Sequence, residues 1–230
     1  MCFLHPYLSL NRGTFKLNMN TIDPQKIVKE DIIEGVHEIP WEIPASSSII
    51  VDDLDQGFST VTESQDSKGL RLKTKQKIDR NQDTDQGLPY ISATILPGGT
   101  RAPGEWSRMT NGVAFGKYRH TAAIIKSGDG DKKALFQTSL PKDGEWDLEF
   151  YIPVKSMFPR KEWGTWHAVV VDDNGDKHEV EFDSKAGTGG WNLVNKLDLP
   201  KGKVTVELSD LTNGDLVVAD AIRWTPAIGN

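Results

Sequence analysis

Cysteine is almost absent from this chain of 230 residues, which carries only Cys2. A single cysteine excludes an intrachain disulfide, so the fold depends on a packed hydrophobic core, for which the chain is long enough. No apolar run approaches the length of a membrane-spanning helix. The first residues also lack the basic start and small-residue cleavage site of a signal peptide. The sequence therefore indicates no direct membrane span and no visible signal peptide.

Catalytic motifs are also missing. The chain contains no phosphate-binding loop, no H-E-x-x-H, no G-x-S-x-G and no C-x-x-C, and its five histidines are scattered. Cys2 has no surrounding motif that would make it a nucleophile. We therefore predict that the chain is not an enzyme. A carboxylate pair for glycoside hydrolysis stays open as an alternative, because the 33 acidic residues allow many pairs.

The charge balance excludes a general nucleic-acid binder. The net charge is −6, whereas such a protein presents a basic face. Basic residues do gather between Arg71 and Lys77, but Asp79, Asp83 and Asp85 follow closely. We interpret this stretch as a solvated loop and expect no nucleic-acid partner.

The composition divides the chain into a leader and a β domain. Residues 1–48 are expected to be a leader or linker with a short helix at 24–34, where Asp23 is the N-cap, Pro24 the first helical residue and Gly35 the stop. Residues 49–228 are expected to form a β-sandwich. A polar stretch rich in Gly, Pro and Asp at about 64–112 predicts a long irregular insert, with a short strand possible at 90–96.

The clearest strands lie in the second half of the chain. Apolar and polar side chains alternate through 145–152, which predicts one buried and one solvated face. Strands at 165–171 and 177–183 flank the turn pair Asn174-Gly175 and predict a hairpin. Asn213-Gly214 predicts a second hairpin between 203–208 and 215–225. Short strands separated by turns favour an all-β, jelly-roll-like antiparallel β-sandwich.

Acidic side chains suggest a structural calcium site. Asp52 and Asp53 follow the first strand, and Asp220 lies on a strand face otherwise made of Val218, Ile222 and Trp224. The first and last strands of a sandwich often pair, which would bring these carboxylates together as oxygen ligands for calcium. A buried carboxylate needs a partner, however, and a lysine, an arginine or backbone N–H groups would serve equally well. The second interpretation makes Asp220 a latch between the last strand and the first.

Seven tryptophans are many for a protein of this size. Trp146, Trp166 and Trp224 fall on apolar strand faces and are expected in the core. Exposed aromatic rings can stack on the apolar face of a sugar, and Trp163 and Trp106 are the better candidates for exposure. Trp191, which lies near glycine-rich turns, is a third candidate, and core or loop packing is the alternative for each.

Several segments in order resemble the golvesin C-terminal / xanthan-lyase-associated carbohydrate-binding-like domain. They are Val-Asp-Asp-Leu-Asp-Gln-Gly-Phe-Ser at 51–59, Gly-Lys-Tyr-Arg-His-Thr-Ala at 116–122, Gly-Asp-Gly-Asp at 128–131, Leu-Pro-Lys-Asp-Gly-Glu-Trp at 140–146, Gly-Trp-Asn-Leu at 190–193 and Val-Val-Ala-Asp-Ala-Ile-Arg-Trp at 217–224. The resemblance implies a sandwich appended to larger, usually exported bacterial proteins. It adds Tyr118 and Arg119 as candidate ligand-binding residues, with a structural role as their alternative.

Two functions follow as expectations. The first is a non-catalytic accessory module of a larger extracytoplasmic bacterial protein, periplasmic or secreted, that binds polysaccharide or mediates interactions. The second is a structural or regulatory C-terminal domain that packs on a catalytic partner, such as a membrane-attached zinc aminopeptidase-like protein, and has no ligand of its own.

Overall fold

The computed structural model describes residues 41, 44–45, 47–63, 84–85, 87–91, 102–153 and 162–227. All of them belong to one compact unit, Ile39–Asn230. The leader up to residue 40, including the helix predicted at 24–34, lies outside the described residues. In the described part of the chain no helix is long and apolar enough to cross a membrane.

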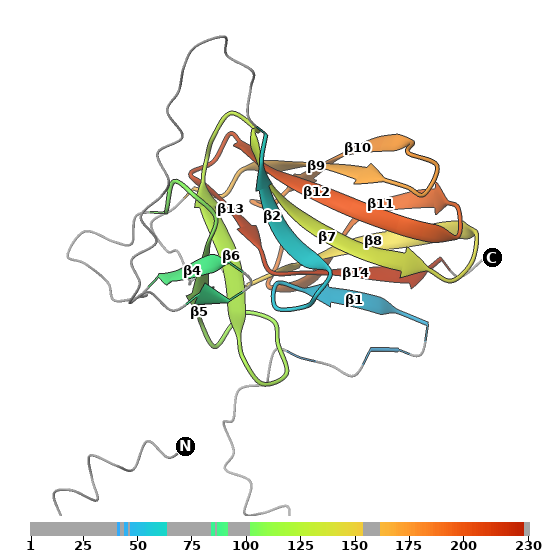
Figure 1. Cartoon of the computed structure of the whole chain (residues 1–230), viewed down its shortest axis with the longest axis horizontal. Coiled ribbons are helices and arrows are strands. Elements are labelled where there is room, and N and C mark those ends of the chain that lie inside the picture. The colour runs from blue at the N-terminus through green and yellow to red at the C-terminus, as the bar shows by residue number, and fades with distance from the viewer. Residues whose placement is uncertain are drawn as a thin grey trace, which may run out of the picture. The chain divides into compact units, whose positions relative to one another are not determined.

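The described residues form β-strands in three sheets (Figure 1). The β8 sheet has the order β1 (Ile49–Asp52), β14 (Ala221–Pro226), β8 (Gly144–Ile152) and β11 (Gly190–Leu199). The β12 sheet has the order β10 (Lys177–Asp183), β9 (Thr165–Val171), β12 (Gly202–Thr212), β7 (Lys132–Leu140) and β2 (Phe58–Thr62). The β6 sheet has the order β13 (Leu216–Ala219), β6 (Thr121–Lys126), β5 (Ser107–Thr110), β4 (Leu88–Ile91) and β3 (Thr84–Asp85).

The β8 and β12 sheets form the two layers of the sandwich, and the β6 sheet lies at one end (Figure 1). Alternate residues of β8 and β12 are buried, because successive side chains of a strand point to opposite faces. Phe150 of β8 contacts Phe182 of β10 with ring centroids 5.9 Å apart, which joins the two layers. Trp146, Trp166 and Trp224 are all buried in this core. The predicted all-β sandwich and these three core tryptophans are confirmed.

The first and last strands pair, as expected for a closed sandwich. β1 runs antiparallel to β14, with Val51 opposite Ile222 and Asp52 opposite Ala221. This register brings the turn after β1 beside Asp220, which lies between β13 and β14. The pairing therefore determines where the acidic residues of both chain segments meet.

The hairpin predicted around Asn174-Gly175 is confirmed. β9 and β10 pair antiparallel from Thr165–Asp183 to Val171–Lys177. Gly175 has a φ of 85°, a conformation that glycine adopts without a steric penalty. The turn is closed further by Asp172, whose side chain accepts hydrogen bonds from the backbone of Asn174 and Asp176.

The second predicted hairpin is wrong. β12 pairs with β7 and β9, whereas β13 pairs with β6 in another sheet. Asn213 and Gly214 pack against Gly164 instead of closing a two-residue turn, and the Asn213 side chain accepts a hydrogen bond from the Thr165 backbone at 2.7 Å. The chain therefore crosses from one sheet to another at this asparagine-glycine pair.

The end of the predicted irregular insert is ordered. Residues 107–110 form β5, which pairs antiparallel with β6 and parallel with β4. The described strand within the stretch expected at 90–96 is β4, which begins and ends earlier, at 88–91. β5 reads as irregular in the sequence because Ser107, Arg108 and Met109 are all buried, so polar and apolar residues do not alternate.

We predict that Gly164→Ala destabilises the fold. A Cβ at this position would lie 2.2 Å from the Asn213 side chain and 2.4 Å from the Gly214 backbone, so the crossover would have to move. Overpacking of this kind costs about 1–3 kcal/mol, measurable as a lower midpoint of urea unfolding. Gly104→Ala is the matched control, because its Cβ would meet only Lys126 Cε at an ordinary 3.5 Å. Equal midpoints for the two variants would contradict the described packing.

Candidate functional site

The candidate site is built on the loop of residues 111–120, which joins β5 to β6. Asn111 and His120 close the loop through a backbone hydrogen bond of 2.9 Å, and the Ala114 N–H donates to the Asn111 carbonyl. The Asn111 side chain accepts a bond from the Val113 backbone, and His120 Nδ1 lies 3.1 Å from the Ala114 carbonyl oxygen. These contacts fix the base of the loop.

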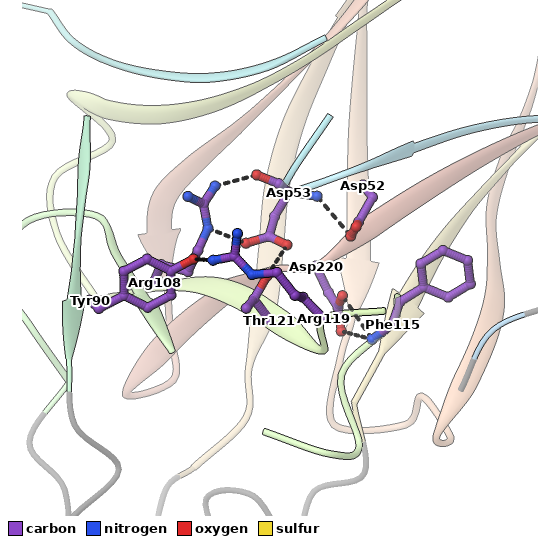
Figure 2. Close-up of polar contacts among 8 residues, drawn as sticks. All are labelled: Asp52, Asp53, Tyr90, Arg108, Phe115, Arg119, Thr121 and Asp220. Carbon is purple, nitrogen blue, oxygen red and sulfur yellow. Dashed lines mark hydrogen bonds and ion pairs between the residues drawn. The ribbon is translucent and has the colours of Figure 1, made fainter. Parts of the chain in front are cut away.

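Asp220 holds the middle of the loop. Its two carboxyl oxygens lie 3.1 and 3.2 Å from the backbone nitrogen of Phe115, which donates to them (Figure 2). The Asp220 backbone oxygen accepts a 2.9 Å hydrogen bond from the Asp53 N–H. Asp220 therefore joins the loop, the β13–β14 connection and the turn after β1. The partner of the carboxyl group is thus a backbone N–H of the 111–120 loop, and only the Asp220 backbone oxygen meets the turn after the first strand.

The ring of Phe115 is a second anchor. It contacts Tyr151 and Trp191 on neighbouring strands of the β8 sheet, with centroids 5.3 and 5.2 Å away. Arg223 lies 4.5 Å from the centre of the Trp191 ring and pairs with Glu149 at 2.6 Å. Trp191 thus packs between Phe115 and Arg223. The structure uses this ring to hold the loop.

Gly116 turns the chain outward after this anchor. Its φ is 145°, and a Cβ there would lie 2.0 Å from the backbone oxygen of Arg119. Only glycine fits both the backbone conformation and the space. The next three residues, Lys117, Tyr118 and Arg119, are exposed. We call these three residues the loop tip.

A buried ion pair lies beneath the loop. Arg108 Nε donates to a carboxyl oxygen of Asp53 at 2.7 Å, and both side chains are fully buried. Arg108 also donates to the Asp53 backbone oxygen, and the Thr121 hydroxyl donates to the other carboxyl oxygen at 2.8 Å (Figure 2). The pair joins β5, β6 and the turn after β1. It gives the buried charge of Asp53 a partner, as burial requires.

Three carboxyl groups, those of Asp52, Asp53 and Asp220, lie near one another beside the single guanidinium of Arg108. Burial, and then the charges of Asp53 and Asp52, raise the pKa of Asp220 well above its ordinary value. Burial and the neighbouring Asp53 raise the pKa of Asp52 to about 8. Burial also raises the pKa of Asp53, while Arg108 lowers it. Asp53 contacts the guanidinium directly, so the ion pair of this cluster is that of Asp53 with Arg108.

The arrangement differs from the calcium site expected from the sequence. Among the described residues no three His, Cys, Asp or Glu side chains are grouped to hold a metal ion. Asp52, Asp53 and Asp220 do lie near one another, but Asp53 is held by Arg108 and Asp220 by the Phe115 N–H. The partners that a calcium ion would have supplied are thus present in the chain itself.

Aromatic rings and cations alternate at the loop tip. Tyr118 is 84% exposed, the largest value among the exposed apolar side chains of the described residues. Lys117 Nζ lies 5.0 Å from the Tyr118 ring centre and 4.9 Å from that of Trp41. The Arg119 guanidinium lies 5.6 Å from the ring centre of Tyr90 and donates to its hydroxyl (Figure 2).

Two tryptophans predicted to be exposed are buried. Trp106 is 4% and Trp163 is 6% exposed, so neither ring is available to a sugar. Trp163 stacks on Trp166, with centroids 5.7 Å apart, and Trp106 belongs to the same hydrophobic core. Stacking on a sugar is therefore excluded for both, and the alternative, core packing, holds. Gly164, next to Trp163, lies in a packed crossover, and Trp106 directly precedes β5, whose first three residues are buried. Of the sequence candidates, the structure leaves Tyr118 and Arg119 accessible.

A groove on the outward face of the β12 sheet is a weaker candidate. Its volume is about 390 Å³, and no Trp, Tyr or Phe lines it. Within it Lys133 lies 3.0 Å from Glu207, and His167 lies 3.3 Å from Glu181. A groove without a flat ring offers less to a glycan than the loop tip does.

Comparison with known families identifies the fold family. The sequence model of the golvesin C-terminal domain matches residues 96–226, more than half of the chain. The chain belongs to this family. In this golvesin-type domain the match begins before β5, so Arg108 and the 111–120 loop lie inside the family region. No curated protein sequence matches the chain.

Solved structures with similar folds include proteins that act on carbohydrates. A xanthan lyase from Paenibacillus is 16% identical with a TM-score of 0.48, over 79% of this chain and 13% of the lyase. The CBM35 module of Cellvibrio japonicus Abf62 is 12% identical with a TM-score of 0.35, over 80% of this chain and 99% of the module. The K1 adhesin domain of Lys-gingipain from Porphyromonas gingivalis is 11% identical with a TM-score of 0.38, over 79% and 99%. The golvesin-type chain thus spans about an eighth of the lyase.

Sequence reasoning missed four residues of the site: Trp41, Tyr90, Arg108 and Lys117. Lys117 stands beside the two candidates that were named, so the Lys-Tyr-Arg sequence was an available signal. Arg108 and Tyr90 lie in the stretch read as an irregular insert, and Trp41 in the stretch read as a leader. Their contacts with the loop depend on tertiary structure, which no local pattern shows.

We predict that the golvesin-type domain becomes less stable as the pH rises from about 4 to about 8. The unfolded chain releases the protons of Asp52 and Asp220 near the ordinary value of 3.8, whereas the folded chain keeps them to a higher pH. Unfolding then releases protons, and the free energy of unfolding falls by up to about 1.4 kcal/mol per pH unit for each proton. Urea unfolding across this range measures the slope.

The variant Asp220→Asn removes one of these protons and should flatten the slope. Its control is Asp129→Asn, which changes an exposed carboxyl in the turn between β6 and β7 and should leave the slope unchanged. A slope that Asp220→Asn leaves as steep as in the parent chain would show that Asp220 is ionised in the folded protein.

We predict that Arg108→Met destabilises the domain strongly. Removal of the guanidinium leaves Asp53 buried without its ionic partner, which costs about 3–5 kcal/mol. In the double variant Arg108→Met with Asp53→Asn the uncompensated charge is gone, so its loss should be smaller than that of Arg108→Met alone. Urea unfolding of the parent chain, Arg108→Met, Asp53→Asn and the double variant gives the coupling energy. Additive losses would contradict a direct pair.

Proposed function

We propose that this golvesin-type domain is a non-catalytic accessory module that binds polysaccharide through its loop tip. The observation that carries the proposal is the side chain of Tyr118, which is 84% exposed on a loop held by Asp220 and Phe115. A large aromatic ring loses apolar hydration when it is covered, and sugar rings present a flat apolar face that can cover it. Binding sites with a prearranged shape lose less conformational entropy on binding.

The chemistry of the site supports a non-catalytic role. The carboxyl groups of Asp53 and Asp220 are buried and hydrogen-bonded within the protein, so neither faces a substrate. The loop tip itself offers an aromatic ring and two cations, a set that suits binding. The proposed role is therefore recognition, with any catalysis left to another part of the parent protein.

The proposed setting is a larger bacterial protein that acts outside the cytoplasm. The family takes its name from a C-terminal domain, which is the position of an appended module. Polysaccharides of the kind that such modules bind lie outside the cell, so we propose a periplasmic or secreted location for the parent protein.

We predict that Tyr118→Ala weakens polysaccharide binding about tenfold, because loss of aromatic stacking removes about 0.5–1.5 kcal/mol together with the buried ring area. Affinity gel electrophoresis of the full chain against a panel of soluble polysaccharides measures this as lost retardation. Leu211→Ala is the matched control, because Leu211 is also an exposed apolar residue, at 43%, but lies at the groove of the β12 sheet.

Two outcomes would count against the proposal. Retardation that Tyr118→Ala leaves unchanged would move the site away from the loop tip. No retardation of the parent chain by any polysaccharide would favour the second function, a structural domain that packs on a catalytic partner without a ligand of its own.

A further inference from the structure

We propose that the loop tip selects anionic sugars, those that carry a carboxylate or sulfate group. This inference rests on the proposed function and names the class of polysaccharide. Its basis is the environment of Lys117, an exposed cation that aromatic rings hold in place, whereas acids hold Lys132, Lys133 and Lys196.

The contrast with other lysines is direct. Lys133 bonds Glu63 and Glu207 at 2.6 and 3.0 Å, and Lys196 bonds Asp147 at 2.6 Å. For Lys117 the contacts within the described residues are the rings of Trp41 and Tyr118. A ring orients an ammonium group without cancelling its charge. Lys117 is therefore a positioned cation whose charge stays available to a ligand.

Arg119 carries the second positive charge of the tip in a similar way. Its guanidinium lies over the ring of Tyr90 and bonds the Tyr90 hydroxyl. Arg108 approaches the same ring, at 5.9 Å, but its charge is balanced by Asp53. Tyr90 thus lies between a buried cation and one at the surface.

The 111–120 loop itself contains no acidic residue. The ten residues at 111–120 include Lys117 and Arg119 and neither Asp nor Glu, in a chain with 33 acidic residues and a net charge of −6. A local positive potential on an acidic protein attracts anions, and it neither attracts nor repels a neutral sugar. The tip therefore favours a charged sugar over its neutral counterpart.

The geometry fits one sugar unit with an acidic substituent. Lys117 Nζ lies over one face of the Tyr118 ring, 5.0 Å from its centre, and the 84% exposed ring offers its other face to a sugar. A carboxylate or sulfate that extends past the edge of the Tyr118 ring would meet the ammonium group. Hydrogen bonds to charged groups are stronger than those between neutral groups, so this contact would discriminate.

Paired polysaccharides that differ in charge test the inference on the full chain. Polygalacturonate is compared with its methyl ester, and dextran sulfate with dextran, by affinity electrophoresis at low and high salt. We expect stronger retardation by the charged member of at least one pair and a loss of the difference at high salt, where exposed charges are screened. The pair that responds tells whether carboxylate or sulfate is preferred.

Substitutions assign the preference to Lys117. Lys117→Gln should weaken binding to the charged polysaccharide at least about fivefold and leave binding to the neutral one unchanged. Lys117→Arg should retain the preference. Lys142→Gln, in the exposed turn between β7 and β8, is the control for net charge and should change neither. Thermal unfolding checks that each variant is folded.

The failures of the two proposals are distinguishable. Equal retardation by the charged and neutral members of both pairs would overturn the anionic preference and leave polysaccharide binding intact. No retardation by any of the four would overturn both. A charge preference that Lys117→Gln and Lys142→Gln reduce equally would show that net charge, and not the tip, is responsible.

Discussion

The buried carboxyl group of Asp220 needs a hydrogen-bond donor inside the protein. Its donor is the backbone N–H of Phe115, and the position of the rest of the site depends on this bond. Asp220 is 2% exposed, and the backbone N–H of Phe115 meets its two oxygens. That bond fixes a residue in the middle of the ten-residue connection, 111–120, between β5 and β6. With Phe115 fixed, its ring packs on the β8 sheet. At the next position, 116, glycine is the one residue type that can turn the chain outward. The exposed tip is the consequence of a buried contact.

The same contact places Asp220 close to two other carboxyl groups, whose charges help to raise its pKa. The register of β1 against β14 brings Asp52 and Asp53 to the connection that carries Asp220. One buried arginine can balance one of these three carboxyl groups, and hydrogen-bonding distance selects Asp53. Protonation neutralises the others at a lower energetic cost than a buried negative charge. The carboxyl cluster lowers the stability of the domain at higher pH. It also connects three segments that are distant in sequence.

The sequence predicted the sandwich well because period-two alternation is a local property. Strands such as β8 and β9, and the Asn174-Gly175 turn, could be read directly from neighbouring residues. The Asn213-Gly214 pair led to a wrong hairpin prediction, because packing against Gly164 overrides the turn preference of this pair. Asp220 could be recognised as an unusual polar residue on an apolar face, yet its partner could not be identified, since Phe115 contributes a backbone group that has no sequence signature. Exposure of Trp106 and Trp163 depended on sheets that meet only in the folded chain.

Stability and recognition are assigned to different residues of one short loop. Phe115 and Gly116 contact the sheet and the backbone, so substitution there disturbs the fold. Lys117 contacts Tyr118 and Trp41, and both Lys117 and Tyr118 are exposed, so they can change at little cost to the core. A loop arranged in this way can present different side chains on a constant backbone. Because the backbone is fixed before a ligand arrives, a change of side chain at the tip alters which sugar is favoured and leaves the shape of the site in place.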